Sequence, residues 1–210
     1  MKLHDAPRSS ACYRVRIALH WKGIPFEKLS VDLLRDGGEQ HHDDYRAVNP
    51  QGLVPTLRDG PVALRQSLAI IEYLEETHPE PRLLPQDPVE RAHVRAMAQL
   101  IACDVHPLNN LRVLRYLEGT LGLGDETRLA WYRHWIAEGL TALESLVAKE
   151  ATSTSFCFRA SPSLADLCLV PQIFNARRYD CPLEPYPTLC RIDAACRELP
   201  AFRAAHPEAE

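Results

Sequence analysis

A small cluster of polar residues near the N-terminus lies where a helix is expected to begin. Ser9 and Ser10 follow Arg8 and directly precede an apolar, helix-like stretch. Hydroxyl groups and unpaired backbone N–H groups at a helix N-terminus, aided by the helix dipole, can hold an anion such as a thiolate. A serine at this place can also be a plain helix cap. Arg8 argues for the anion site, because a cation there opposes the dipole and indicates an anionic partner nearby.

Two further stretches could hold the polar ends of an extended peptide. Pro55 interrupts the strand-like segment Leu53–Leu57, and a proline removes a donor from a sheet. A cis bond between Val54 and Pro55 would turn the backbone groups of Val54 outward, where they could pair with a peptide. Gln66 and Ser67 open a second helix, whose side chains, backbone N–H groups and dipole can together hold a carboxylate. A plain helix cap explains this pair equally well.

The fourth stretch lies further along the chain, at a predicted break in a helix. It runs from Asp104 to Arg112 and contains His106 and Pro107. We expect Pro107 to bend or break the helix, because a proline loses one hydrogen bond and clashes with the preceding turn. Polar residues at such a break often line a cavity, whereas a single histidine is more often structural. Both interpretations of His106 stay open at this point.

The elements that must position the first three stretches alternate between strands and helices. After a short opening segment, the pattern predicts a helix that ends at Gly23, a strand over 26–31 and irregular polar chain. A hairpin with its corner at Asp59 and Gly60 follows. The next helix is predicted over 67–77. The order β-α-β-β-β-α is typical of a thioredoxin-like fold.

A proline-rich linker and a helical half come next. Four prolines between Pro79 and Pro88 disfavour a helix in that segment. Beyond this segment, a helix is predicted to begin at Asp87 and Pro88 and to continue past Ile101. Apolar residues at helical spacing predict a second helix over 131–147, and a capping box from Ser163 to Asp166 predicts the start of a third. We therefore predict an α/β plus all-α fold, with a thioredoxin-like domain over 1–82 and an all-helical domain over 87–210.

The composition argues against several classes of protein. Apolar residues make up 46% and charged residues 25% of the chain, which is ordinary for a folded protein and too hydrophobic for disorder. The net charge of −4 argues against a nucleic-acid or membrane partner. No apolar run is long enough for a signal peptide or a membrane span, so we expect a cytoplasmic protein. We expect free thiols, and no metal site at His41 and His42.

Taken together, the four stretches resemble the zeta class of glutathione transferases, and the resemblance covers nearly the whole chain. The residues that carry it are Arg8, Ser9 and Ser10 with Arg14–Leu19, Asn49 and Pro50 with Leu53–Leu57, the run Gln66–Glu76, and Pro81–Pro88. The resemblance implies a thioredoxin-like domain that holds glutathione and an all-helical domain that completes the pocket for an acidic substrate. It also implies a homodimer.

Carried over position by position, the resemblance assigns three roles to residues of this chain. The catalytic set would be Ser9, Ser10, Arg8 and His106, with the serines facing the glutathione sulfur. Glutathione would be held by Gln40, Val54, Pro55, Gln66, Ser67, His106 and Asn110. The carboxylates of the substrate would meet Arg8, Arg112 and Arg178, with Arg177 as the alternative to its neighbour.

The activity implied by the resemblance is glutathione-dependent cis–trans isomerisation of maleylacetoacetate or maleylpyruvate to the fumaryl product, in the catabolism of tyrosine and phenylalanine or of gentisate. The runs Asp104–Asn110 and Ala176–Tyr179 are most similar to the bacterial maleylpyruvate isomerases of the class. Ala11 departs from the class, whose usual cysteine is displaced here to Cys12, and this argues against a role for a protein thiol. Two alternatives stay open, a transferase that conjugates or dehalogenates small haloacids and a non-catalytic binding module.

Overall fold

The computed structural model describes residues 1–150 and 154–209, and contacts divide it into two units. The first joins Met1–Arg82 to Leu199–Glu210, and the second comprises Leu83–Glu198. We expected everything from residue 87 onward in the helical domain, whereas the segment after residue 198 packs with the first unit. The reason is a buried polar contact, because Arg16 Nε donates to the carbonyl of Ala205 at 3.0 Å. The division into a glutathione-binding domain over residues 1–82 and a substrate-binding domain over residues 87–210 stays a prediction.

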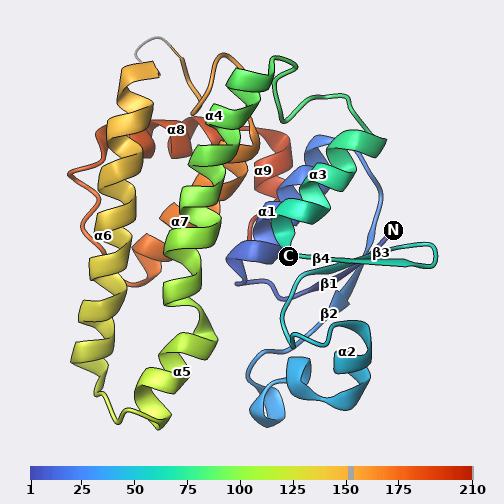
Figure 1. The fold of residues 1–210 in the computed structure, drawn as a ribbon, viewed down its shortest axis with the longest axis vertical. Coiled ribbons are helices and arrows are strands. Elements are labelled where there is room, and N and C mark those ends of the chain that lie inside the picture. The colour runs from blue at the N-terminus through green and yellow to red at the C-terminus, as the bar shows by residue number, and fades with distance from the viewer. Residues whose placement is uncertain (151–153, 210) are drawn as a thin grey trace. The chain divides into compact units, whose positions relative to one another are not determined.

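A four-stranded sheet organises the first unit, with strand order β2-β1-β3-β4. The strands are β1 Lys2–Asp5, β2 Glu27–Ser30, β3 Thr56–Asp59 and β4 Val62–Arg65. β1 pairs with β2 in parallel and with β3 antiparallel, so that Leu3 lies opposite the equally buried Leu57. Helices α1 (Ser10–Trp21) and α3 (Ser67–Thr77) cover one face of the sheet, and α2 (Asp43–Val48) lies on the other (Figure 1). The predicted thioredoxin-like half is confirmed.

The segment that we predicted as irregular polar chain between β2 and β3 contains short helical turns. They are the 3₁₀ turns η1 (Arg35–Gly37) and η2 (Glu39–His41), followed by α2. Asp43 and Asp44 lie in the first turn of α2, where acidic side chains complement the helix dipole. Tyr45 is the residue of α2 whose side chain is buried. Six residues with one buried side chain show too little apolar period to be recognised in a sequence.

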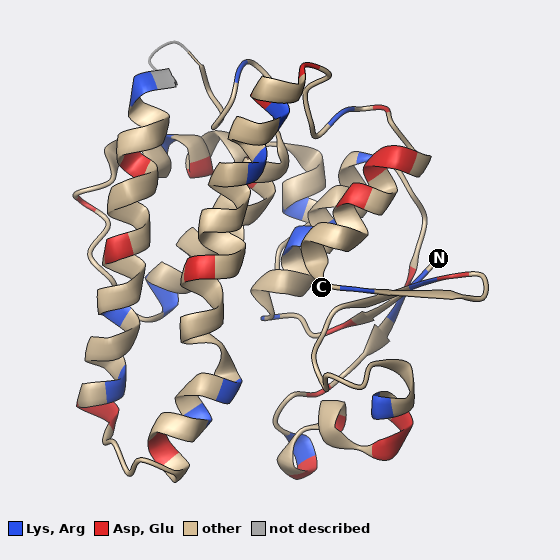
Figure 2. Ribbon diagram, in the orientation of Figure 1, with Lys and Arg blue, Asp and Glu red and all other residues tan. Residues whose placement is uncertain are grey.

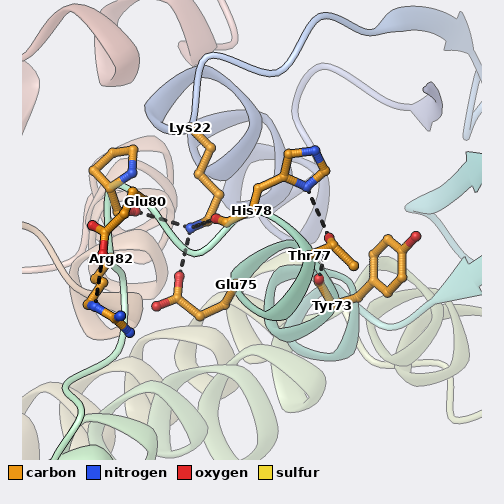
Figure 3. A network of polar contacts seen from close by, with 8 residues as sticks. Lys22, Tyr73, Glu75, Thr77, His78, Glu80 and Arg82 are labelled. Atoms are coloured by element: carbon orange, nitrogen blue, oxygen red, sulfur yellow. Dashed lines mark hydrogen bonds and ion pairs between the residues drawn. The ribbon is translucent and has the colours of Figure 1, made fainter.

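A buried lysine ties together the ends of two helices and the start of the linker (Figure 3). Lys22, at the C-terminal end of α1, donates from Nζ to Glu75 Oε2 at 2.7 Å, to the His78 carbonyl at 2.7 Å and to the Pro81 carbonyl at 3.1 Å. Its side chain is fully buried, and a buried ammonium group is tolerated only where its charge and donors are matched. The three acceptors meet that requirement.

The second unit is helical throughout its regular structure. Its elements are α4 (Pro88–Gln99), the π-helix η3 (Leu100–Val105), the 3₁₀ helix η4 (His106–Asn109), α5 (Leu111–Gly119), α6 (Asp125–Glu150), α7 (Leu164–Arg178) and α8 (Pro187–Arg197). α7 is the most buried, and the predicted capping box opens it, with Ser163 and Asp166 satisfying each other's backbone N–H groups. No helix within the described residues is both long and apolar enough to cross a membrane.

The predicted break around Pro107 is present, and the chain reaches it through a π-helix rather than a continued α-helix. α4 ends at Gln99, and the wider turns of η3 lead to Val105. Val105 packs against Gly139 of α6, where a Cβ atom would lie 2.0 Å from Val105 Cγ2. The close approach of these two helices therefore requires a glycine, and π-turns of this kind occur frequently at functional sites.

Candidate functional site

The start of α1 has the geometry of an anion site. Ser9 has extended backbone dihedrals and is the N-cap, and its Oγ accepts a hydrogen bond from the Cys12 backbone N–H at 3.3 Å. Ser10 is buried in the first turn, while Arg8 is exposed. The Cys12 side chain is fully buried, and this burial raises the pKa of its thiol to about 12. Cys12 therefore stays protonated at neutral pH and provides no thiolate.

The loop before β3 is held rigidly by two side chains. Tyr45 Oη and Asn49 Nδ2 both donate to the Leu53 carbonyl at 2.7 Å. The bond between Val54 and Pro55 is cis, as the sequence analysis considered. Within residues 1–150 and 154–209, the backbone N–H and C=O of Val54 have no hydrogen-bond partner. Both backbone polar groups of one residue beside the sheet are thus available to a ligand.

A buried arginine of α1, Arg14, lies beside the start of α3. Gln66 is the N-cap with a φ of 69°, and its side chain donates to Gln51 Oε1 at 3.1 Å. Ser67 is buried, and its Oγ accepts from Arg14 Nη1 at 3.2 Å. A guanidinium beside a helix N-terminus reinforces its positive potential, and both favour a carboxylate. In the sequence, Arg14 is one of two arginines within the apolar helix 10–21, and nothing in the local pattern shows that it contacts Ser67.

Gln40 lies in η2 and is buried. Its Oε1 has no hydrogen-bond partner among the described residues. Gly38, with φ of 109°, gives it room, because a Cβ there would lie 2.5 Å from Gln40 Nε2. Gly52 also lies close to Gln40, whose carbonyl oxygen would be 3.0 Å from a Cβ added at Gly52. Gln40 is therefore packed against the loop that carries Val54.

These contacts bring most of the predicted glutathione residues into one connected set. Gln40 contacts the loop 49–54 through Gly52, and Gln51 of the same loop contacts Gln66. Ser67 is joined to α1 through Arg14, and Ser9 and Ser10 begin that helix. Among the described residues, no group of three or more His, Cys, Asp or Glu side chains could hold a metal ion.

The predicted residues of the second unit lie after the π-helix. His106 begins η4 and is half-buried, and Asn110 caps α5 by accepting from the Arg112 backbone N–H at 3.1 Å. α6 holds this segment, since Trp131 Nε1 donates to the Leu108 carbonyl at 2.9 Å and Asn109 Nδ2 donates to the Tyr132 carbonyl at 3.1 Å. Trp131 and Asn109 were not among the predicted residues. Their hydrogen bonds position the segment.

The structure separates the roles of the two neighbouring arginines at the end of α7. Arg177 Nη2 lies 2.7 Å from Oδ2 of the buried Asp193. Arg178 donates to Asn175 Oδ1 at 3.3 Å and lies over the rings of Phe174 and Tyr179, at 5.9 and 5.8 Å from their centroids. The Tyr179 ring stacks on Tyr132 at 3.8 Å, so Arg178 is linked by contacts to the segment around Asn110.

The arginines assigned to substrate share one property. Arg8, Arg112 and Arg178 are exposed, and none has a carboxylate partner among the described residues. In the second unit, basic residues occur on α5 and α6 (Figure 2). Guanidinium groups bind carboxylates through two parallel hydrogen bonds. Each of these guanidinium groups is therefore suited to a carboxylate of a ligand.

Comparison with known proteins gives one consistent result. The profile described as "Glutathione S-transferase, N-terminal domain" matches residues 3–82. The chain is 52% identical to a probable maleylacetoacetate isomerase of Vibrio cholerae, over 96% of this chain and 93% of that protein. It resembles a zeta-class bacterial maleylpyruvate isomerase structure with a TM-score of 0.97 and 47% identity, covering 100% and 98% of the two chains. A maleylacetoacetate isomerase from Methylobacterium extorquens AM1, solved with malonate and glutathione, gives a TM-score of 0.95 and 42% identity over 100% and 98% of the chains.

Proposed function

This chain belongs to the zeta class of the glutathione S-transferase family, and we propose that it catalyses the glutathione-dependent cis–trans isomerisation of maleylacetoacetate or maleylpyruvate to the fumaryl product. One observation supports this function above others. A rigid, connected set of polar groups in the first unit fits a small peptide, while Arg8, Arg112 and Arg178 lack a carboxylate partner among the described residues. The first feature suits glutathione, and the second suits a diacid.

Several residues of the first unit fit glutathione. Ser67 and Gln66 would hold the γ-glutamyl carboxylate, because Ser67 lies at a helix N-terminus with Arg14 behind it. Val54 would pair with the cysteinyl backbone, which its unpaired N–H and C=O support. Gln40 would contact the glycyl end, and the unpaired Oε1 of this buried side chain supports a polar ligand there. The fit rests on these polar groups.

The chemistry requires a sulfur nucleophile, and the buried thiol of Cys12 does not supply it. Glutathione, when bound, would supply a thiolate that adds to the cis double bond; after rotation about the resulting single bond, departure of the thiolate would restore the double bond in the trans product. The Ser9 hydroxyl and the first N–H groups of α1 stabilise negative charge at their helix N-terminus, which lowers the pKa of a thiol placed there. Ser10, buried in the same turn, completes that end of the helix.

The substrate half of the site consists of cations and one histidine. Arg8, Arg112 and Arg178 bind the two carboxylates and hold the ends of the substrate while its central bond turns. Arg178 is preferred to Arg177, because Arg177 is already paired with Asp193. His106 and Asn110 orient glutathione beside the substrate, and the imidazole can move a proton.

The direct test is ultraviolet-monitored isomerisation of maleylpyruvate and of maleylacetoacetate, each with and without glutathione. We expect glutathione-dependent turnover, and the ratio of the two kcat/KM values identifies the preferred substrate. The double variant Arg8→Ala/Arg178→Ala should lose isomerisation while keeping glutathione binding. Unchanged turnover in this variant would show that the diacid assignment is wrong. Conjugation of haloacids without isomerisation would favour the transferase alternative, and glutathione binding without either activity would favour a binding module.

Assembly and location belong to the same proposal. We place the active form as a homodimer in the cytoplasm, which the family resemblance supports. Sedimentation equilibrium of the purified protein tests the first statement, because a dimer has twice the 23.7 kDa of one chain. Fractionation of the source cells tests the second.

A further inference from the structure

Arg16 is a second buried arginine of α1, and its guanidinium group contacts four residues. Its side chain is 2% exposed. Nη1 donates to Asp5 Oδ1 at 2.6 Å and to the Ala6 carbonyl at 3.5 Å, and Nη2 donates to the Pro7 carbonyl at 2.8 Å. Nε donates to the Ala205 carbonyl of α9 (Pro200–Ala205) at 3.0 Å. Every nitrogen of the guanidinium group is therefore used.

Three of these four acceptors are consecutive residues of one short loop. Asp5 ends β1, and Ala6 and Pro7 lead directly to Arg8 and Ser9. The Ala6 carbonyl also accepts from the Ser9 backbone N–H at 3.0 Å. The position of Ser9 relative to the helix thus depends on a loop whose carbonyl groups are fixed by one side chain from a later turn of the same helix.

We propose that Arg16 is a positioning residue for the glutathione sulfur: it fixes the loop 5–7, and through that loop it sets Ser9 and the first N–H groups of α1. This inference rests on the proposed function. Arg16 touches neither glutathione nor substrate in this scheme, and it acts through Ser9. A guanidinium group suits the task, because its fixed planar fork reaches several carbonyl groups at once, whereas an ammonium group is a single point of attachment.

The effect of Arg16 is one of position rather than of charge. Arg16 and Asp5 form a buried pair, with side chains 2% and 6% exposed, so their charges largely cancel at a distance. Replacing both by neutral residues leaves the net charge unchanged. Any change in the ionisation of bound glutathione in such a variant reports the position of Ser9 and of the helix N-terminus.

The same helix provides a matched control at its other end. Lys22 is also buried, also pairs with one carboxylate and also binds two backbone carbonyl groups (Figure 3). Its partners are Glu75, His78 and Pro81, which lie at the end of α3 and in the linker and have no role in the proposed site. Disrupting Lys22 therefore damages the fold in a comparable way without affecting the loop before Ser9.

The experiment compares Asp5→Asn/Arg16→Met and Arg16→Lys with the control Lys22→Met/Glu75→Gln. The ultraviolet absorbance of the thiolate, titrated against pH with saturating glutathione, gives the pKa of the bound thiol, and calorimetry gives the Kd of glutathione. Both Arg16 variants should raise the pKa of the bound thiol by about one unit, in line with the loss of oriented donors from a thiolate. The control should match wild type in that pKa while losing comparable thermal stability.

Two results separate this inference from the function on which it rests. If the wild-type protein does not lower the pKa of bound glutathione, the proposed sulfur site itself is wrong. If wild type lowers that pKa and the folded Arg16 variants lower it equally, the sulfur site stands and the positioning role of Arg16 is refuted. Arg16→Lys keeps the charge and leaves no buried carboxylate unpaired, so it decides the question even where the double variant folds poorly.

Discussion

The residues proposed to hold glutathione and those proposed to hold the diacid differ in how the protein supports them. In the first unit, Ser67 is backed by Arg14, Gln66 by Gln51, and the loop before Val54 by two hydrogen bonds to one carbonyl. In the second unit, Arg112 and Arg178 are exposed. Arg178 has one amide contact and rests on aromatic rings. The first set is held by neighbouring side chains, whereas the second has few such contacts.

This difference matches the two kinds of ligand. Glutathione has the same structure in every turnover, so a preorganised site gains affinity by avoiding the entropic cost of ordering its groups. The candidate diacids differ in the length of their keto-acid arm, and long arginine side chains can follow carboxylates at different positions, at a cost in rotamer entropy. Variants of each half should therefore have different kinetic consequences.

The largest effect is expected at Arg178. Arg178→Ala should lower kcat/KM for the preferred diacid by about 100-fold, the loss of a charge-assisted bidentate contact, and leave the Kd of glutathione nearly unchanged. Arg177→Ala is the control, because it removes one of the two arginines paired with Asp193 and leaves Arg197 in place, so it should lower stability by about 1 kcal/mol while sparing kcat/KM. Steady-state kinetics and urea unfolding measure both. The reverse pattern would assign the substrate contact to Arg177.

Gly139 of α6 supports the end of η3, which leads to the segment that carries His106. A methyl group there overlaps Val105 Cγ2, so Gly139→Ala should destabilise the protein by about 2 kcal/mol. The overlap should also shift the end of η3 and lower kcat through His106. Gly119→Ala is the control, because a Cβ at Gly119 meets nothing within 4 Å. Urea unfolding together with kcat checks this, and a stable, fully active Gly139→Ala protein would contradict it.

A smaller effect is expected at Ser67, one of the residues proposed to hold glutathione. Ser67→Ala should raise the Kd of glutathione by about tenfold, because one hydroxyl contact is lost beside a buried cation. The kcat at saturating glutathione should change little, since the fixed neighbours keep the rest of the site in place. Calorimetry measures the Kd, with Ser145→Ala as control, whose hydroxyl donates only to the Thr141 carbonyl within α6. A fall in kcat without a change in Kd would place Ser67 closer to the chemistry.

The smallest effect on activity is expected at Cys12. Burial raises the pKa of this thiol to about 12 from an ordinary value of 9.0, so Cys12→Ala should keep kcat within about twofold. The raised pKa stabilises the folded state fully below about pH 9, and this contribution is lost as the pH rises toward 12. Cys12→Ala should therefore show a smaller loss of stability between pH 8 and pH 10 in urea unfolding. An unchanged slope would show that Cys12 is not buried in solution.

The thioredoxin-like order and the capped starts of α4 and α7 followed from local patterns in the sequence. Three features did not follow from local patterns, because one is a very short helix and the other two depend on contacts with residues far away in the sequence. α2 has only six residues, the course of η3 depends on Gly139, and α9 joins the first unit through a bond between Arg16 and Ala205, which are 189 residues apart.

The candidate site divides in the same way. Residues at helix starts, such as Ser9 and Ser67, were predictable because caps and anion sites share one local pattern. The residues that hold them in place were not predictable. Arg14 and Arg16 resemble ordinary surface charges in a sequence, and only the fold reveals that both are buried. Whether a charged residue pairs with a buried partner depends on the tertiary structure, and neither composition nor hydrophobic periodicity reveals it.

The bond between Arg16 and Ala205 has a consequence for protein synthesis. A ribosome releases residues 1–82 long before it reaches α9, yet that segment and α9 belong to one unit. While 83–198 are being made, the Arg16 guanidinium lacks its Ala205 acceptor, and its environment near α9 stays open to water. The hydrogen bonds of Arg16, which holds the loop before Ser9, can therefore be completed only after the helical half has been translated.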